Sequence, residues 1–93
     1  MIRGFRHKGL RDLFLTGRSG GVRPDLQKRC LIRLDAMNAA TTLTQLDLPG
    51  FRLHQLKGEQ AGRWAINVNG PWRITFEWSQ DGHADRIDLE QYH

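Results

Sequence analysis

The chain has 93 residues, 39% of them hydrophobic, and a formal net charge of +4. This length predicts one domain over residues 1–93. It contains no apolar run near the ~20 residues of a membrane span, and no apolar signal region follows the basic N-terminus. A single cysteine, Cys30, excludes a disulfide within the chain. We therefore expect a cytoplasmic protein in a reducing environment, without membrane contact.

The positive charge is concentrated in the first half of the chain. Residues 1–46 hold nine Lys and Arg against three Asp and Glu, whereas residues 47–93 hold five against seven. A small basic domain often binds nucleic acid. A highly charged, solvated surface explains the same composition, so charge alone leaves both interpretations open.

A short edge strand and a first helix are predicted at the N-terminus. Residues 1–5 suit the edge strand. Residues 7–16 are predicted to be helical because Leu10, Leu13 and Phe14 recur at the spacing of one helix face. Gly17 is a plausible C-terminal cap, and a glycine-rich loop with two arginines follows.

A second helix is predicted to begin at Pro24, where the missing N–H of proline costs nothing. The helix is expected to end near residues 39–42. Ile32 falls outside the apolar stripe and is either a partner contact or, more simply, a lone exposed apolar residue. The stripe that should face the core consists of Leu26, Cys30, Leu34 and Met37.

The second half of the chain predicts an antiparallel meander. A turn at Pro49–Gly50 precedes a short alternating strand in residues 51–58. Residues 64–69 are a half-buried strand. The Asn69-Gly70-Pro71 sequence is a hairpin signal for which we expect a three- or four-residue loop. Strands over residues 72–78 and 83–90 complete the meander.

The strand over residues 72–78 has two unlike faces, because side chains alternate along a strand. Its bulky apolar face is predicted to be the centre of the core, and its polar face carries an arginine that stays charged. The apolar face holds Trp72, Ile74, Phe76 and Trp78, and the polar face holds Arg73, Thr75 and Glu77.

The last strand is expected to add polar groups to the face that carries Arg73. If the strand continues, Tyr92 lies on that face, and His54 and Lys57 could flank it. Together with His93 these groups can bind a phosphate, stack a base and move protons. A polar, solvent-facing sheet with a frayed end is the alternative.

These elements predict an α+β fold, with an N-terminal strand and two helices packed on one face of a mainly antiparallel sheet. The four histidines lack metal-ligand spacing, and no glycine-rich phosphate loop follows a strand. The sequence therefore predicts neither a metal nor a cofactor.

The chain resembles the HigB toxins of bacterial type II toxin–antitoxin systems, in the RelE superfamily. The similar segments are residues 1–10, residues 53–58 (Leu-His-Gln-Leu-Lys-Gly), residues 72–76 (Trp-Arg-Ile-Thr-Phe) and the terminal Tyr-His. They occur in the family's order and spacing over nearly the whole chain.

The resemblance implies a RelE-like fold and a metal-independent endoribonuclease that cuts messenger RNA in the ribosomal A site. It also implies a helix-turn-helix antitoxin of the HigA type, through which the toxin would reach DNA only indirectly. The alternative is a non-catalytic basic module that binds RNA or protein. The site residues that the resemblance implies are His54, Lys57, Arg73, Gln91, Tyr92 and His93.

Position 91 departs from the family pattern, which has an aspartate immediately before the terminal Tyr-His. Glutamine can exchange hydrogen bonds but cannot accept a proton as a base.

In the basic half of the chain, the expected contacts to ribosomal RNA are Arg18, Arg23, Lys28 and Arg29.

Overall fold

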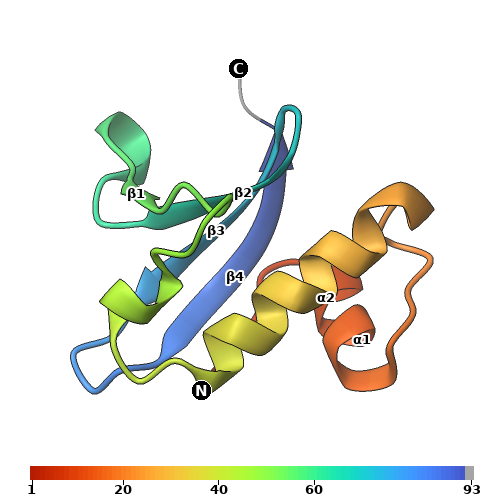
Figure 1. The fold of residues 1–93 in the computed structure, drawn as a ribbon, viewed down its shortest axis with the longest axis horizontal. Coiled ribbons are helices and arrows are strands. Elements are labelled where there is room, and N and C mark those ends of the chain that lie inside the picture. Colours follow the sequence, from red (N-terminus) through yellow and green to blue (C-terminus); the bar gives the residue numbers. More distant parts are fainter. Residues whose placement is uncertain (92–93) are drawn as a thin grey trace.

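The structure, a computed structural model, describes residues 1–91. It contains two helices and a four-stranded sheet (Figure 1). The helices are α1 (Lys8–Thr16) and α2 (Pro24–Ala39), with short 3₁₀ helices η1 (Leu43–Leu46) and η2 (Gly58–Gln60). The strands are β1 (His54–Gln55), β2 (Trp64–Asn69), β3 (Trp72–Trp78) and β4 (Ala84–Gln91).

Local sequence signals determine where the helices begin and end. The His7 Nδ1 atom accepts a hydrogen bond from the Leu10 backbone N–H at 3.0 Å and caps α1. Gly17 ends α1 with a φ of 84°, which glycine adopts without steric cost. Pro24 opens α2 as predicted. No helix within residues 1–91 has the length and apolar character to cross a bilayer.

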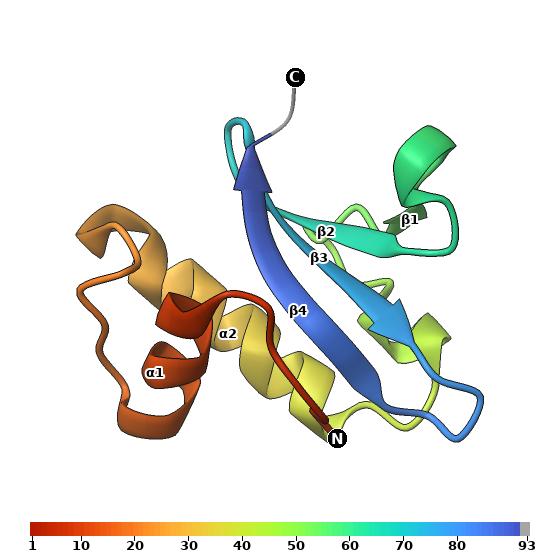
Figure 2. The ribbon, with the colours of Figure 1, turned by 180° about the vertical axis from the view of Figure 1, so that it is seen from behind.

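The sheet is an antiparallel meander in the order β1-β2-β3-β4. The N-terminal segment runs beside β4 and makes two isolated parallel bridges, Ile2 with Ala84 and Phe5 with Ile87. The predicted edge strand is therefore in the expected place but is reduced to two bridges. Figure 2 shows this segment running along β4, with α1 and α2 together beside the sheet.

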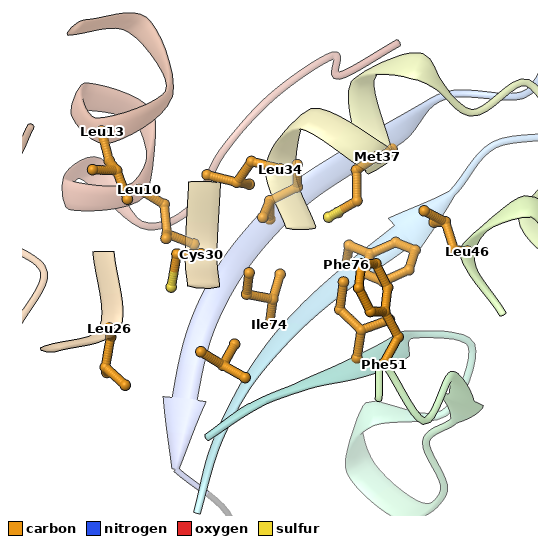
Figure 3. Close-up of a cluster of buried hydrophobic side chains, with 14 of the residues drawn as sticks. Leu10, Leu13, Leu26, Cys30, Leu34, Met37, Leu46, Phe51, Ile74 and Phe76 are labelled. Atoms are coloured by element: carbon orange, nitrogen blue, oxygen red, sulfur yellow. The ribbon is translucent and has the colours of Figure 1, made fainter. Parts of the chain in front are cut away.

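The core lies between α2 and one face of the sheet. All four members of the predicted stripe on α2 are buried, and Ile74 and Phe76 of β3 have no exposed surface. Figure 3 shows Leu34 and Met37 of α2 close to these two strand residues. Cys30 belongs to this core, and burial raises the pKa of its thiol to about 11. The predicted α+β class, with helices on one face of an antiparallel sheet, is confirmed.

Two strand predictions were wrong in detail. Only His54 and Gln55 pair within the predicted strand over residues 51–58, since Phe51 is drawn into the core and Arg52 adopts a φ of 50°. The hairpin between β2 and β3 has two linking residues instead of three or four. Gly70 takes a φ of 55° there, so Asn69 pairs directly with Trp72.

The face of the sheet opposite the helices is less open than its polar side chains suggested. Thr75 has no exposed surface and Arg63 is 6% exposed. The Arg63 guanidinium donates to the Thr75 hydroxyl at 3.0 Å and to the Arg86 carbonyl at 2.9 Å. Arg86 marks a bulge, with a φ of 48° and a register shift between β3 and β4. A buried arginine immediately before β2 thus connects the start of that strand to β3 and β4.

Candidate active site

Strand register places Arg73 on the face of the sheet opposite the helices. Arg73 pairs with Asn67 on β2 and with Glu90 on β4, and paired residues share a face. Two residues farther along β3, Thr75 pairs with Ala65, and Ala65 pairs with His54. His54, which was expected to flank the face that carries Arg73, thus lies on that face by register.

Two adjoining hollows meet at Arg73. One has a volume of about 390 Å³ and is lined by Leu56, Lys57, Glu59, Gln60 and Arg73. The other has a volume of about 170 Å³ and is lined by Arg52, His54, Asn67 and Arg73. Because Arg73 forms a wall of both, a ligand in either hollow lies within reach of its guanidinium.

The charges around the hollows suit an anionic ligand. Among residues 1–91, Arg52, Lys57 and Arg73 contribute three cations to the two linings, and Glu59 contributes the one carboxylate. Arg52 and Lys57 are exposed, whereas Arg73 is half-buried. A half-buried guanidinium interacts more strongly with a phosphate than an exposed one, because water screens it less.

The orientation of His54 is determined by a backbone carbonyl. The His54 Nδ1 atom lies 2.8 Å from the Arg52 carbonyl oxygen. A carbonyl only accepts, so Nδ1 must carry the hydrogen, and Nε2 of the neutral ring is left as a proton acceptor. The positive φ of Arg52 belongs to this turn. Sequence reasoning missed Arg52, although an arginine two residues before a candidate histidine was visible.

Gln91 does not join the hollows. It pairs with Trp72, so it lies on the face opposite Arg73, and its side chain is exposed. The predictions for Tyr92 and His93 fall outside the described residues. Glu90 shares the face of Arg73, as the alternation of the strand had indicated.

None of the four predicted RNA-contact residues lines either hollow. Arg18 is in the loop between the helices, and Lys28 and Arg29 are exposed on α2. Arg23 precedes α2, pairs with Asp25 at 2.9 Å and lies 6.0 Å from the Trp72 ring centroid. Since α2 covers the other face of the sheet, these residues form a separate basic surface.

Arg33 is a second residue beside the hollows that sequence reasoning missed, although its spacing from Cys30 and Met37 puts it on the buried face of α2. Its Nε donates to the Asn67 carbonyl at 2.6 Å, and its guanidinium lies 4.8 Å from the Phe51 ring centroid. Asn67 N–H in turn donates to the Phe51 carbonyl at 2.6 Å. Arg33 thereby joins α2 to the two segments that carry Arg52, His54 and Asn67.

Within residues 1–91, no three His, Cys, Asp or Glu side chains gather in a way that could hold a metal ion. The fold and the site together define a small α+β domain with a cationic, histidine-bearing face that is suited to binding a phosphodiester.

Comparison with known proteins identifies the family. The sequence profile described as RelE-like toxin of type II toxin-antitoxin system HigB matches residues 3–93. Endoribonuclease HigB of Proteus vulgaris is 41% identical over 93 residues, and the alignment covers all of both chains. The chain belongs to the HigB-like toxin family, whose general activity is ribosome-dependent cleavage of messenger RNA. Membership of a type II toxin–antitoxin family implies an antitoxin partner.

Proposed function

We propose that the two hollows around Arg73 are the active site of a ribosome-dependent endoribonuclease, and that His54 is its general base. The observation that carries this assignment is the contact between His54 Nδ1 and the Arg52 carbonyl. It leaves Nε2 as the basic atom on the face that carries Arg73.

The chemistry is attack of a ribose 2′-oxygen on the neighbouring phosphorus. Nε2 of His54 accepts the 2′-hydroxyl proton as the new P–O bond forms. The P–O5′ bond then breaks, and its electron pair stays on the leaving 5′-oxygen, which takes a proton. The products are a 2′,3′-cyclic phosphate and a 5′-hydroxyl.

Arg73 and Lys57 stabilise the negative charge that develops on the phosphate oxygens. Each lines the larger hollow, so the two cations approach one bound phosphate from different elements. The resemblance assigns Tyr92 and His93 to the same site, where either could protonate the leaving oxygen or Tyr92 could stack a base.

The partners that we propose are the ribosome with its bound message, and a HigA-type helix-turn-helix antitoxin. Contact with DNA would occur only through that antitoxin. Action on translating ribosomes places the protein in the cytoplasm. The basic surface of Arg18, Arg23, Lys28 and Arg29 would contact ribosomal RNA while the hollows face the message.

The test is single-turnover cleavage of a defined message, with and without ribosomes. We expect clear cleavage of ribosome-bound message and negligible cleavage of naked RNA. His54→Ala should slow the bound reaction by about 10²-fold or more, the contribution typical of a general base. Arg73→Ala should slow it by about 10²–10³-fold.

Arg11→Ala is the matched control, because Arg11 is an exposed cation on α1, away from the hollows. It should leave the rate within about twofold, as expected for surface substitutions. A wild-type protein that binds ribosomes without cutting the message would refute the enzyme assignment and favour a non-catalytic binding module.

A further inference from the structure

The larger hollow beside Arg73 has more room than one phosphate group needs. Its volume is about 390 Å³, within the range of roughly 300–1,000 Å³ found for pockets that bind whole small molecules. Lys57 and Arg73 provide cations for one phosphate. The remaining space can take the ribose and base of an adjoining nucleotide.

The lining of this hollow has groups that match each part of a nucleotide. The cations suit the phosphate, and Leu56, which is 8% exposed, provides an apolar wall against which the face of a base can pack. Glu59 and Gln60 add side-chain oxygens that accept hydrogen bonds. Such acceptors suit the edge of a base, which carries N–H donors, and not an ionised phosphate, which carries none.

The Glu59 carboxylate is not paired with the cations that share its hollow. Within residues 1–91, none of the ion pairs involves Glu59. Its negative charge opposes those of Lys57 and Arg73 and by itself weakens the binding of a phosphate. A carboxylate at this place is explained if the ligand also brings a hydrogen-bond donor to it.

Backbone hydrogen bonds hold the segment that carries Glu59. Residues 56–63 form a loop that is closed at its base, because the Leu56 N–H donates to the Arg63 carbonyl at 2.8 Å. Within the loop, the Arg63 N–H donates to the Gln60 carbonyl at 3.0 Å. The Arg63 side chain is itself anchored in the sheet. Glu59 therefore projects from an anchored turn, which lowers the entropic cost of ordering it against a ligand.

An ionised carboxylate distinguishes nucleobases because it only accepts hydrogen bonds. Adenine and cytosine present an exocyclic amino group, which donates, whereas uracil presents a carbonyl oxygen, which accepts. Hypoxanthine, the base of inosine, has a carbonyl in place of the amino group of adenine. A carbonyl that faces the carboxylate leaves both oxygens without a donor, which is unfavourable.

We propose that Glu59 is a specificity-determining residue, whose carboxylate accepts a hydrogen bond from the exocyclic amino group of a base beside the scissile phosphate. This role rests on the proposed ribonuclease function. The nucleotide enters the larger hollow with its phosphate at Lys57 and Arg73 and its base against Leu56. Messages with adenine or cytosine at that nucleotide are cut faster than messages with hypoxanthine or uracil.

The test compares messages that differ in one exocyclic group. Ribosomes hold a defined message with an empty A site, and single-turnover cleavage is measured. At each nucleotide flanking the cut in turn, adenosine is replaced by inosine, or cytidine by uridine. Each exchange converts an amino group to a carbonyl with little change in size. At one of the two positions we expect the wild-type rate to fall by about 10–10²-fold, the discrimination given by one good base contact.

Glu59→Gln keeps the size of the side chain and lets it donate as well as accept hydrogen bonds. The ratio of rates between amino and carbonyl messages should therefore fall below about threefold, because an amide satisfies either group. Carbonyl messages should be cut faster by Glu59→Gln than by the wild-type protein. A purely structural role would slow all messages alike, and melting temperatures provide the folding control.

Asp47→Asn is the matched control. Asp47 is an exposed carboxylate that follows η1, and it lines neither hollow. Its removal changes the net charge by the same amount as Glu59→Gln. We expect Asp47→Asn to keep the wild-type ratio of rates within about twofold, as for other surface substitutions.

Equal wild-type rates on amino and carbonyl messages would overturn the proposal. A Glu59→Gln variant that keeps the wild-type ratio, or that slows all messages equally, would also overturn it, since Glu59 would then not select the base. Loss of the ratio in Asp47→Asn would show a general charge effect, with the same consequence. Failure of the wild-type protein to cut any ribosome-bound message would instead refute the underlying function.

Discussion

Replacing Arg33 tests how far the active site depends on the helix layer behind it. Arg33 is buried on α2, donates to the Asn67 carbonyl at 2.6 Å and to the Arg29 carbonyl at 3.1 Å, and lies over Phe51. Arg33→Met keeps an unbranched apolar stem and removes these polar contacts. We expect loss of both stability and cleavage.

The magnitude follows from the contacts. The hydrogen bond from a charged donor to Asn67 contributes about 1.5–3 kcal/mol, and the cation–π contact about 0.5–1 kcal/mol. Removing the guanidinium also removes the cost of burying it, which offsets part of this sum. The expected loss in the free energy of unfolding is about 2 kcal/mol. For a domain of this size that corresponds to a fall in Tm of about 8–16 °C.

The assay is thermal unfolding by circular dichroism, with cleavage measured well below the lowered Tm. Arg29→Met is the control, because Arg29 is exposed on the same helix and carries the same charge. It should change the free energy of unfolding by less than about 0.5 kcal/mol. Equal Tm values for the two variants would refute the reasoning, since Arg33 would then contribute no more than a surface cation.

Three further predictions concern position 91, salt and the cysteine. Gln91→Asp should change the single-turnover rate by less than about threefold, because Gln91 pairs with Trp72 on the face opposite Arg73; a gain of tenfold or more would contradict this. Affinity for the ribosome should fall steeply as ionic strength rises. Alanine at each contributing residue of the basic surface should reduce the slope of log affinity against log salt concentration by about 0.7–0.9. If affinity does not depend on salt, those cations do not contact ribosomal RNA. Cys30 is buried and its pKa is raised to about 11, so it stays a protonated thiol at pH 8. Iodoacetamide should therefore modify the native protein far more slowly than the urea-unfolded chain. Equal rates would show that the thiol is accessible in the native protein.

The local elements of this protein were largely determined by sequence patterns of short range. The 3.6-residue spacing in α2, proline at its start and glycine after α1 predict both helices, because each signal acts within one or two turns. Alternation along β3 predicts the buried pair Ile74 and Phe76 and puts Arg73 on the other face. The α+β class follows from the order of these elements.

Tertiary structure alone decided the composition of the site. Arg63 stands in a turn-like stretch, and only the packing of β2, β3 and β4 shows that it is buried against Thr75. Arg33 lies on the same face of α2 as the apolar stripe, but arginine is rarely buried, and its burial here depends on a carbonyl 34 residues away. The bond of His54 to Arg52 depends on a positive φ that no propensity predicts for arginine. Strand register and buried polar contacts involve partners far apart in the chain, so local sequence patterns do not predict them.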